Sequence, residues 1–338
     1  MKKRRIGDTR LEVSEYGFGG ASLGNLYQVV SREDSMAALD AAWSAGMRYF
    51  DTAPHYGFGL SERRFGDYLR HKPRDSYVLS TKVGRLLRPV SEDQVPKLGF
   101  VDPLPFKLDY DYSYDGIMRS VDFSYARLGL NRIDILFVHD IGVYTHGVEL
   151  TKVHMKQFLD GGLKALEELK RSGVISAYGL GVNEVQVCLD VLRQAPLDCI
   201  LLAGRYTLLD RTAEAELIPL CRKKKTSLVV GGVFNSGILA TGPVVGAHFD
   251  YGPATPEIQT KVRAMMKLAA DGGYPLAAAA LEFPLQNDTV ATVLIGTAKA
   301  SSLTRNMKLL KTKIAPPDFD KHRPHTIIQV VPTGVVRE

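Results

Sequence analysis

The sequence contains only three cysteines, Cys188, Cys199 and Cys221, among 338 residues. Three is an odd number, and their spacing is not that of a zinc site, which argues against both a disulfide framework and a metal centre. No run approaches the roughly 18 apolar residues that a membrane-spanning helix needs. The basic N-terminus lacks the apolar stretch of a secretory signal. We therefore expect a cytoplasmic protein with reduced cysteines, no metal and no membrane contact.

Long runs of a single charge are also scarce. The net charge is +6, and the basic clusters are confined to residues 2–5 and 222–225. Neither cluster is interleaved with aromatic residues, so a nucleic-acid partner is not expected. The first is expected to be a solvated terminus, and the second ends a predicted helix, where cations suit the helix dipole. A mildly positive protein suits an anionic cofactor and a small-molecule substrate.

What the sequence does contain is a regular alternation of short apolar strands with helices. We expect a polar-apolar hairpin at residues 4–13, and then strands at 16–20, 47–50, 77–82, 132–139, 175–181, 199–202, 227–231 and 290–295. Strand-helix alternation implies a parallel sheet, and eight such units favour a closed (β/α)8 TIM barrel over an open sheet. No change in composition marks a linker, so residues 1–338 are interpreted as one domain. Within it, 315–338 is expected to be a surface extension with a candidate strand at 327–331.

The longest irregular segments all follow a strand and precede a helix. They are residues 84–112, 140–155 and 232–254. In a barrel such loops all lie on the C-terminal face, and loops of this length are usually functional. Polar residues at strand ends, Asp51, Lys82 and His139, are predicted on the same face. This coincidence indicates an enzyme.

Asp51, Tyr56, Lys82 and His139 would together suit proton transfer at a carbonyl or carbinol oxygen. A tyrosine phenol has a pKa of about 10, and a nearby lysine cation lowers it. Asp51 can hold the lysine in place, and the histidine can orient the reacting oxygen. Taken singly, Asp51 could be a helix cap and Tyr56 a core residue. The set lacks a nucleophile and a metal cage, so a nicotinamide cofactor is the natural carrier of the electrons.

The sequence resembles the aldo-keto reductase superfamily over about residues 4–310. DTAPHYG at 51–57, STK at 80–82 and FVHD at 137–140 match the family's motifs, in the family's order. The opening hairpin resembles its barrel-bottom plug, and IGTAKASSLTRN at 295–306 continues the match. The resemblance implies that Tyr56 is the general acid/base, that Lys82 and Asp51 tune it, and that His139 orients the substrate oxygen.

Within the superfamily, GFGGASLGNLY, APHYGFGLSERRFG and LLAGRYTLLD are most similar to the branch of bacterial aldose (L-fucose or D-threo-aldose) 1-dehydrogenases. Pyridoxal 4-dehydrogenase and plant L-galactose dehydrogenase are close to that branch. The resemblance implies oxidation of an aldose hemiacetal to its lactone with NAD(P)+, and oxidation of pyridoxal to 4-pyridoxolactone is the alternative. A third possibility is a non-catalytic, cofactor-binding partner module like the potassium-channel β subunits of the superfamily.

The resemblance places a cofactor site around the later strands, with departures from the family pattern. The family's Ser-Asn pair after strand 5 is reduced to Asn183, and Ala298 stands where NADP-preferring members often carry arginine. NAD is therefore favoured, with NADP as the alternative. The backbone of residues 231–237 is expected to wrap the pyrophosphate. The cofactor contacts expected in full are Asn183, Arg205, Tyr206, Gly231, Phe234, Ser236, Gly237, Lys299 and Asn306.

The substrate side is less defined. His55 is expected to be a pocket wall. Phe106 and Tyr110 of the first long loop could stack on a sugar or simply pack that loop down. Two other patterns are judged to be chance. The glycines of residues 17–20 do not open a helix, as a dinucleotide fingerprint would. The YxxxK spacing at 68–72 falls too early in the chain for a short-chain dehydrogenase. Nothing in the sequence indicates the oligomeric state.

Overall fold

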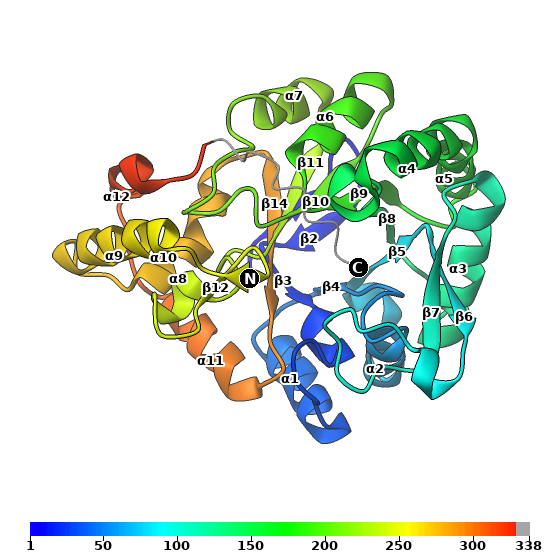
Figure 1. Cartoon of the computed structure of the whole chain (residues 1–338), viewed down its shortest axis with the longest axis horizontal. Helices are drawn as coiled ribbons and strands as arrows, with labels where there is room; N and C mark the ends of the chain where they lie inside the picture. The colour runs from blue at the N-terminus through cyan, green and yellow to red at the C-terminus, as the bar shows by residue number, and fades with distance from the viewer. Residues whose placement is uncertain (329–338) are drawn as a thin grey trace.

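The computed structural model describes residues 1–328, and eight parallel strands among them close into a barrel (Figure 1). Around the barrel the strands follow their order in the chain. The predicted (β/α)8 fold is thus confirmed. The barrel strands are β3 (Tyr16–Gly19), β4 (Tyr49–Asp51), β5 (Val78–Val83), β8 (Ile135–His139), β9 (Ala177–Val182), β10 (Cys199–Ala203), β11 (Ser227–Gly231) and β14 (Val290–Gly296).

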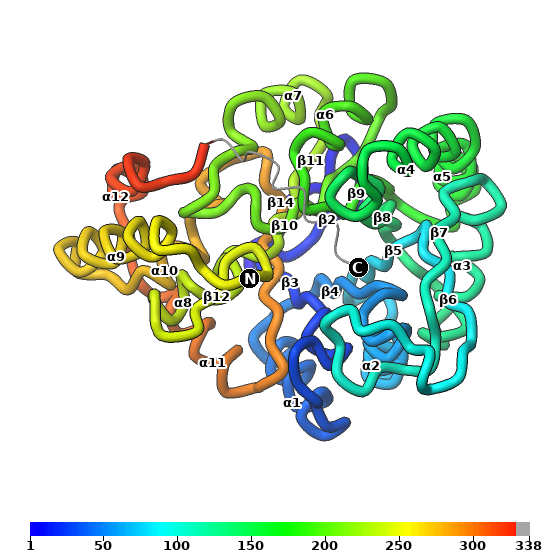
Figure 2. The backbone as a smooth tube through the Cα atoms, in the orientation of Figure 1, coloured from blue at the N-terminus to red at the C-terminus, as the bar shows by residue number. Residues whose placement is uncertain are grey.

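Helices surround the barrel, as the ribbon and the backbone tube both show (Figures 1 and 2). Their apolar faces and the outward side chains of the strands form the larger of two hydrophobic clusters. The three cysteines are buried and free, as expected. The helices are α1 (Arg32–Ser44), α2 (Leu60–Leu69), α3 (Tyr114–Leu128), α4 (Val143–Gln157), α5 (Leu163–Arg171), α6 (Val185–Gln194), α7 (Leu217–Lys224), α8 (Ile238–Thr241), α9 (Pro256–Asp271), α10 (Leu276–Glu282), α11 (Ala300–Leu309) and α12 (Pro316–Lys321).

The N-terminal hairpin closes the bottom of the barrel, as the sequence predicted. Strands β1 (Lys3–Arg5) and β2 (Glu12–Ser14) pair antiparallel. Ile6 and Val13 are fully buried and join the cluster that fills the barrel interior. Gly7 N donates a 2.8 Å hydrogen bond to the Ser227 hydroxyl at the start of β11. The bottom is therefore sealed, and the opposite, C-terminal end is left for the site.

All three long segments are more regular than expected. Residues 84–112 contain an antiparallel ribbon of β6 (Arg85–Pro89) and β7 (Phe106–Tyr110). Residues 140–155 lie mostly in α4, which contains a kink at Gly147. The third segment, 232–254, carries short strands β12 (His248–Phe249) and β13 (Gly252–Pro253). All three still rise from the C-terminal ends of barrel strands.

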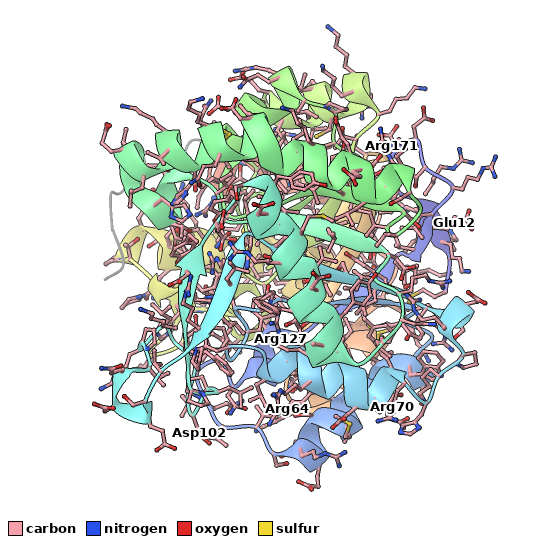
Figure 3. The ribbon with its side chains drawn as sticks, turned by 90° about the vertical axis from the view of Figure 1, so that its right-hand side faces the viewer. Glu12, Arg64, Arg70, Asp102, Arg127 and Arg171 are labelled. Carbon is pink, nitrogen blue, oxygen red and sulfur yellow. The ribbon has the colours of Figure 1, made fainter. Side chains whose placement is uncertain are left out.

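Helices α2 and α3 brace the strand that carries Lys82. Figure 3 shows α3 crossing α2, with Arg127 near the crossing. Arg127 forms an ion pair with Glu62 of α2, whose side chain is fully buried. The other Glu62 oxygen accepts a 2.8 Å hydrogen bond from the Thr81 hydroxyl in β5. Two helices and a strand are thereby joined directly behind the site.

The start of the segment expected to be a surface extension packs onto the barrel. Phe319 of α12 is buried against Phe283, and His322 is also buried. Ile327 forms an isolated bridge with Asp210, and the rest of the candidate strand at 327–331 lies outside the described residues. Within residues 1–328, no helix combines the length and the apolar character required to cross a membrane.

Candidate active site

The four predicted catalytic side chains come together at the ends of three neighbouring strands. Asp51 ends β4, Lys82 lies in β5 and His139 ends β8, while Tyr56 lies in the turn after β4. Strand β5 pairs with β4 on one side and with β8 on the other. Because these strands are parallel, their carboxyl ends share one face of the barrel.

Lys82 is fixed by two acceptors. Its ammonium donates a 2.7 Å hydrogen bond to Asp51 Oδ2 and a 2.9 Å bond to Thr52 O. Asp51 Oδ1 accepts a 2.7 Å bond from the Ser80 hydroxyl. The Lys82 and Asp51 side chains are only 2% and 3% exposed. Burial opposes the charge of Lys82, but Asp51 and Tyr56 outweigh it and raise the pKa of Lys82. The site therefore contains a fixed cation.

Tyr56 lies directly over this cation. Lys82 Nζ is 4.7 Å from the centre of the Tyr56 ring. The sequence predicted a lowered phenol pKa, and that is only half right. Burial raises the pKa of Tyr56 above its ordinary value, and Lys82 lowers it by less than burial raises it. The free enzyme therefore presents a protonated phenol beside an ammonium.

His139 faces Tyr56 across the site. The two ring planes are perpendicular, with centres 6.0 Å apart. Burial, with the positive charges of Arg85 and Lys82, keeps the pKa of His139 well below its ordinary value, so the ring is neutral at pH 7. Its Nδ1 is buried without a hydrogen-bond partner among the described residues. Nε2 is therefore the ring nitrogen that can reach a substrate.

Tyr56, Lys82 and His139 line a cavity of about 440 Å³ at the mouth of the barrel. That volume is typical of small-molecule sites. Its walls combine aromatic, aliphatic and charged side chains. They comprise Ala21, Leu26, Tyr27, His55, Tyr56, Lys82, Arg85, Lys97, Leu98, Gly99, Phe100, Tyr110, His139, Asp140, Tyr144, Thr145, Gly181, Val182, Asn183, Leu201, Ala203 and Tyr251.

The cavity includes two of the three predicted substrate contacts. His55 lies 5.8 Å from His139 between ring centres, and Tyr110 ends β7 at the cavity wall. Phe106 does not line the cavity. It pairs with Pro89 at the far end of the ribbon, four residues along β7 from Tyr110. At about 3.4 Å per residue, Phe106 lies too far along β7 from Tyr110 to contact a substrate in the cavity.

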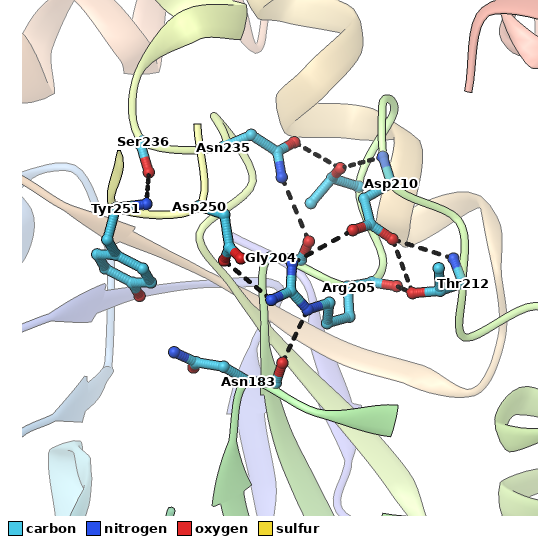
Figure 4. A network of polar contacts seen from close by, with 10 residues as sticks. Asn183, Gly204, Arg205, Asp210, Thr212, Asn235, Ser236, Asp250 and Tyr251 are labelled. Atoms are coloured by element: carbon cyan, nitrogen blue, oxygen red, sulfur yellow. Dashed lines mark hydrogen bonds and ion pairs between the residues drawn. The ribbon is translucent and has the colours of Figure 1, made fainter. Parts of the chain in front are cut away.

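Arg205 lies within a network of polar contacts (Figure 4). Its Nε donates to Asn183 O at 2.8 Å, and Nη2 contacts Asp250 at 2.9 Å. Nη1 contacts Asp210 at 3.4 Å. The guanidinium therefore ties the end of β9 to the turn between β12 and β13. These contacts favour a positioning role for Arg205 over the predicted direct contact with the cofactor.

Tyr206 is also displaced from its predicted place. Its side chain is 3% exposed and packs on Phe283, with ring centres 5.2 Å apart. Phe283 belongs to the short helix that follows α10, so Tyr206 points into the layer between barrel and helices. This position argues against a cofactor contact. The chain turns just before Tyr206, at Gly204, whose φ is +72°.

The predicted phosphate-wrapping segment forms a tight turn beyond β11. Gly231 ends the strand, and Phe234 is half-buried against the core. Ser236 Oγ accepts a 2.9 Å hydrogen bond from Tyr251 N (Figure 4). Gly237 has φ +98°, and no atom lies within 4 Å of where its Cβ would stand. The backbone here is therefore open to close approach by a ligand.

The last predicted cofactor residues lie beyond β14. Lys299 is exposed and is the N-cap of α11, whereas Asn306 on that helix is buried. Ala298 is buried as well, at 8% exposure.

The sequence analysis missed several residues of the cavity wall. Phe100 packs edge-on against His55, with ring centres 5.1 Å apart. Tyr251 reaches the cavity from the turn between β12 and β13. Arg85 and Asp140 form a 2.7 Å ion pair within it. Phe100 and Tyr251 lie in segments without periodicity, which is why no pattern singled them out.

Replacing Arg205 with methionine should lower the free energy of unfolding by about 3–5 kcal/mol, because Asp210 would lose its buried cation. Asp210 is fully buried. A urea titration followed by circular dichroism measures the change. Arg222 is the matched control, since its pair with Asp288 is exposed, and Arg222→Met should leave the midpoint unchanged. Equal midpoints for the two variants would contradict the structural role given to Arg205.

Comparison with known proteins agrees with this geometry. A model of the Aldo/keto reductase family matches residues 15–325. The chain belongs to the aldo/keto reductase family. It is similar in structure to the holo form of an aldo-keto reductase from Bacillus halodurans, with a TM-score of 0.78 and 26% identity over 99% of both chains.

Three curated relatives of this aldo/keto reductase are named as dehydrogenases. Pyridoxal 4-dehydrogenase of Microbacterium luteolum is 44% identical over 94% of this chain and 95% of that protein. D-threo-aldose 1-dehydrogenase of a Pseudomonas species is 39% identical over 90% and 91%. L-galactose dehydrogenase of Arabidopsis thaliana is 28% identical over 91% and 87%. The predicted family branch is confirmed, and the protein is an oxidoreductase whose family uses NAD(P)H.

Proposed function

We propose that this aldo/keto reductase oxidises the hemiacetal carbon of an aldose, of the L-fucose, L-galactose or D-arabinose type, to a lactone with NAD(P)+. The supporting observation is the arrangement of Tyr56, Lys82 and neutral His139 in one cavity, with Asp51 paired to Lys82. An aldose dehydrogenase among the relatives favours the same substrate class.

Each residue has a defined task in this reaction. His139 Nε2 donates a hydrogen bond to the reacting hydroxyl oxygen and orients it. Tyr56 accepts the hydroxyl proton, and Lys82 stabilises the phenolate that receives it. When bound, a nicotinamide dinucleotide would supply the hydride acceptor for the carbon that carries this hydroxyl. Asp51 keeps the ammonium of Lys82 in position throughout.

The residues present fit such a cofactor. The turn of residues 231–237 offers backbone in the left-handed region at Asn235 and Ser236, and open space at Gly237. Successive backbone groups in such turns suit a pyrophosphate. Asn183 lines the same cavity as Tyr56, so a nicotinamide contacting it would lie beside the reacting carbon.

NAD is the cofactor we favour over NADP. Buried Ala298 stands where an arginine would bind a 2′-phosphate. The exposed cation next to it, Lys299, is only a partial substitute for that arginine. A charge-assisted hydrogen bond is worth about 1.5–3 kcal/mol, so the missing arginine should cost NADP+ on the order of tenfold or more in relative kcat/KM.

A spectrophotometric screen tests the function. L-fucose, L-galactose, D-arabinose, pyridoxal and pyridoxine would each be offered with NAD+ and with NADP+, and reduced cofactor recorded at 340 nm. We expect turnover of at least one aldose, with NAD+ preferred. Tight cofactor binding without turnover of any alcohol or aldehyde would instead support the partner-module alternative.

Oxidation of pyridoxal to its lactone is the second candidate. It is favoured by the relative that is 44% identical and by the aromatic walls of the cavity, Phe100, Tyr110 and Tyr251. Pyridoxal also reacts as a cyclic hemiacetal, so the same Tyr56 chemistry applies. Pyridoxal turnover without any aldose turnover would select this candidate.

The oxidation rate should rise with pH. Burial raises the pKa of Tyr56, so the phenol is protonated at pH 7 and must lose its proton before it can act as a base. We therefore expect kcat/KM for oxidation to increase from about pH 7 into the alkaline range and to level off only there. The reverse reduction should weaken over the same range. An oxidation profile that falls above neutral pH would contradict this assignment.

A further inference from the structure

A buried ion pair lies beside the catalytic histidine. Arg85 Nη2 is 2.7 Å from Asp140 Oδ2, and the same oxygen is 3.4 Å from His139 Nε2. The Arg85 side chain is 4% exposed and that of Asp140 is 19% exposed. Both line the cavity that contains Tyr56. The more exposed member of the pair is thus a carboxylate at the reaction centre.

The backbone holds both members in place. Asp140 follows β8 directly and has φ +44°, a conformation that non-glycine residues rarely adopt. Arg85 follows Gly84, whose φ is +93° and whose Cβ would come within 2.3 Å of the Tyr112 ring. A turn restricted to glycine therefore sends Arg85 back toward the cavity. Strained backbone of this kind concentrates at functional sites.

Stability does not explain the pair. A buried ion pair gives little net stabilisation, because removing both charges from water costs about as much as their attraction returns. Arg85 is only 4% exposed and its Nη2 is used by Asp140, so the carboxylate is the more accessible of the two to a substrate. The role of Arg85 is to hold the carboxylate in its ionised, hydrogen-bond-accepting form. Burial raises the pKa of Asp140, and Arg85 opposes that shift.

We propose that Asp140, positioned by Arg85, determines specificity by accepting a hydrogen bond from the substrate hydroxyl next to the reacting carbon. The proposal rests on the aldose oxidation proposed above. His139 Nε2 contacts the reacting oxygen, and Asp140 Oδ2 lies 3.4 Å from that nitrogen. Adjacent hydroxyl oxygens of a sugar are separated by a similar distance. A donor and an acceptor at this spacing fit the two oxygens of a vicinal diol.

The competing role for Asp140 is to act through His139, by holding its tautomer. The two roles make different demands on the substrate. A role through His139 would affect every alcohol equally, because every alcohol needs the histidine. A direct hydrogen bond would affect only substrates that carry the adjacent hydroxyl. D-arabinose and 2-deoxy-D-ribose form a matched pair that differs only in this group.

The test compares kcat/KM of the wild type and Asp140→Asn on these two sugars with NAD+. Wild type should prefer D-arabinose. The substitution should lower its kcat/KM for D-arabinose by about 10–100-fold, the range of a charged hydrogen bond, and for 2-deoxy-D-ribose less than about threefold. Asp109→Asn is the control, because Asp109 pairs with Arg88 on the same ribbon, and neither residue lines the cavity. It should change neither value.

Two further measurements keep the outcomes separate. The affinity of Asp140→Asn for NAD+ without sugar, measured by calorimetry, should match that of the wild type if the variant is folded. If Asp140→Asn does not fold, Asp140→Ser takes its place in the test. Equal losses on both sugars would overturn the direct contact and assign Asp140 to His139. Turnover of pyridoxal alone by the wild type would overturn the aldose function and this proposal together. Preference for D-arabinose that vanishes only in the Asp140 variant supports the proposal.

Discussion

Tyr56→Phe should reduce kcat for oxidation by about three orders of magnitude or more, because the site then has no group to take the hydroxyl proton. The substitution removes one oxygen and leaves the ring in its contacts with His139 and Phe100. Stopped-flow or steady-state formation of reduced cofactor measures the loss. Cofactor affinity and thermal stability should remain close to those of the wild type.

Tyr110→Phe is the matched control for this prediction. It removes a phenol oxygen from the same cavity but at the ribbon, where Tyr110 packs edge-on against His146 with ring centres 4.6 Å apart. We expect a change of less than about tenfold, of the size of one neutral hydrogen bond. If Tyr56→Phe kept turnover within tenfold of the wild type, another base would have to be sought among the cavity residues.

The fold could be predicted because its signal is local and repeated. Each barrel strand is a short apolar run, and each is followed by a helix with its own start and stop residues, such as Ser31 before α1 and Gly129 after α3. The catalytic residues could be placed for a related reason. A buried strand that ends in a charged side chain, as β4 ends in Asp51, is not explained by apolar packing, because burying a charge without a partner is costly.

The long segments could not be predicted in the same way. Residues 84–112 contain four prolines and were interpreted as irregular. Pro89 nevertheless pairs with Phe106, at the end of the β-ribbon farthest from Arg85 and Tyr110. Proline is compatible with ribbon edges because it need not donate to a ladder. The kinked helix α4 was missed because Gly142 and Gly147 interrupt its pattern.

The ion pairs were the feature that was hardest to predict from the sequence. Arg85 and Asp140 are 55 residues apart in the chain, and Arg205 and Asp250 are 45 apart. Nothing in their local sequences indicates a partner, since the contact depends on how two long loops fold over the barrel mouth. Arg205 was therefore assigned to the cofactor when it in fact holds the loops.

Lys82→Met should impair both folding and catalysis. The substitution leaves Asp51, whose side chain is 3% exposed, without its cation, and breaking such a pair costs about 3–5 kcal/mol. It also removes the charge that opposes the upward shift of the Tyr56 pKa. We expect kcat at pH 7 to fall by about 100-fold or more, and the urea midpoint to fall with it.

The double variant Lys82→Met with Asp51→Asn separates these two effects. With both charges removed, no uncompensated charge stays buried, so much of the lost stability should return. Turnover should not return, because Tyr56 still lacks the ammonium 4.7 Å from its ring. A double variant that recovered activity along with stability would mean that Lys82 serves only the fold. Recovery of stability alone would show that this barrel keeps a buried ion pair for the phenol it supports, since the fold itself can do without it.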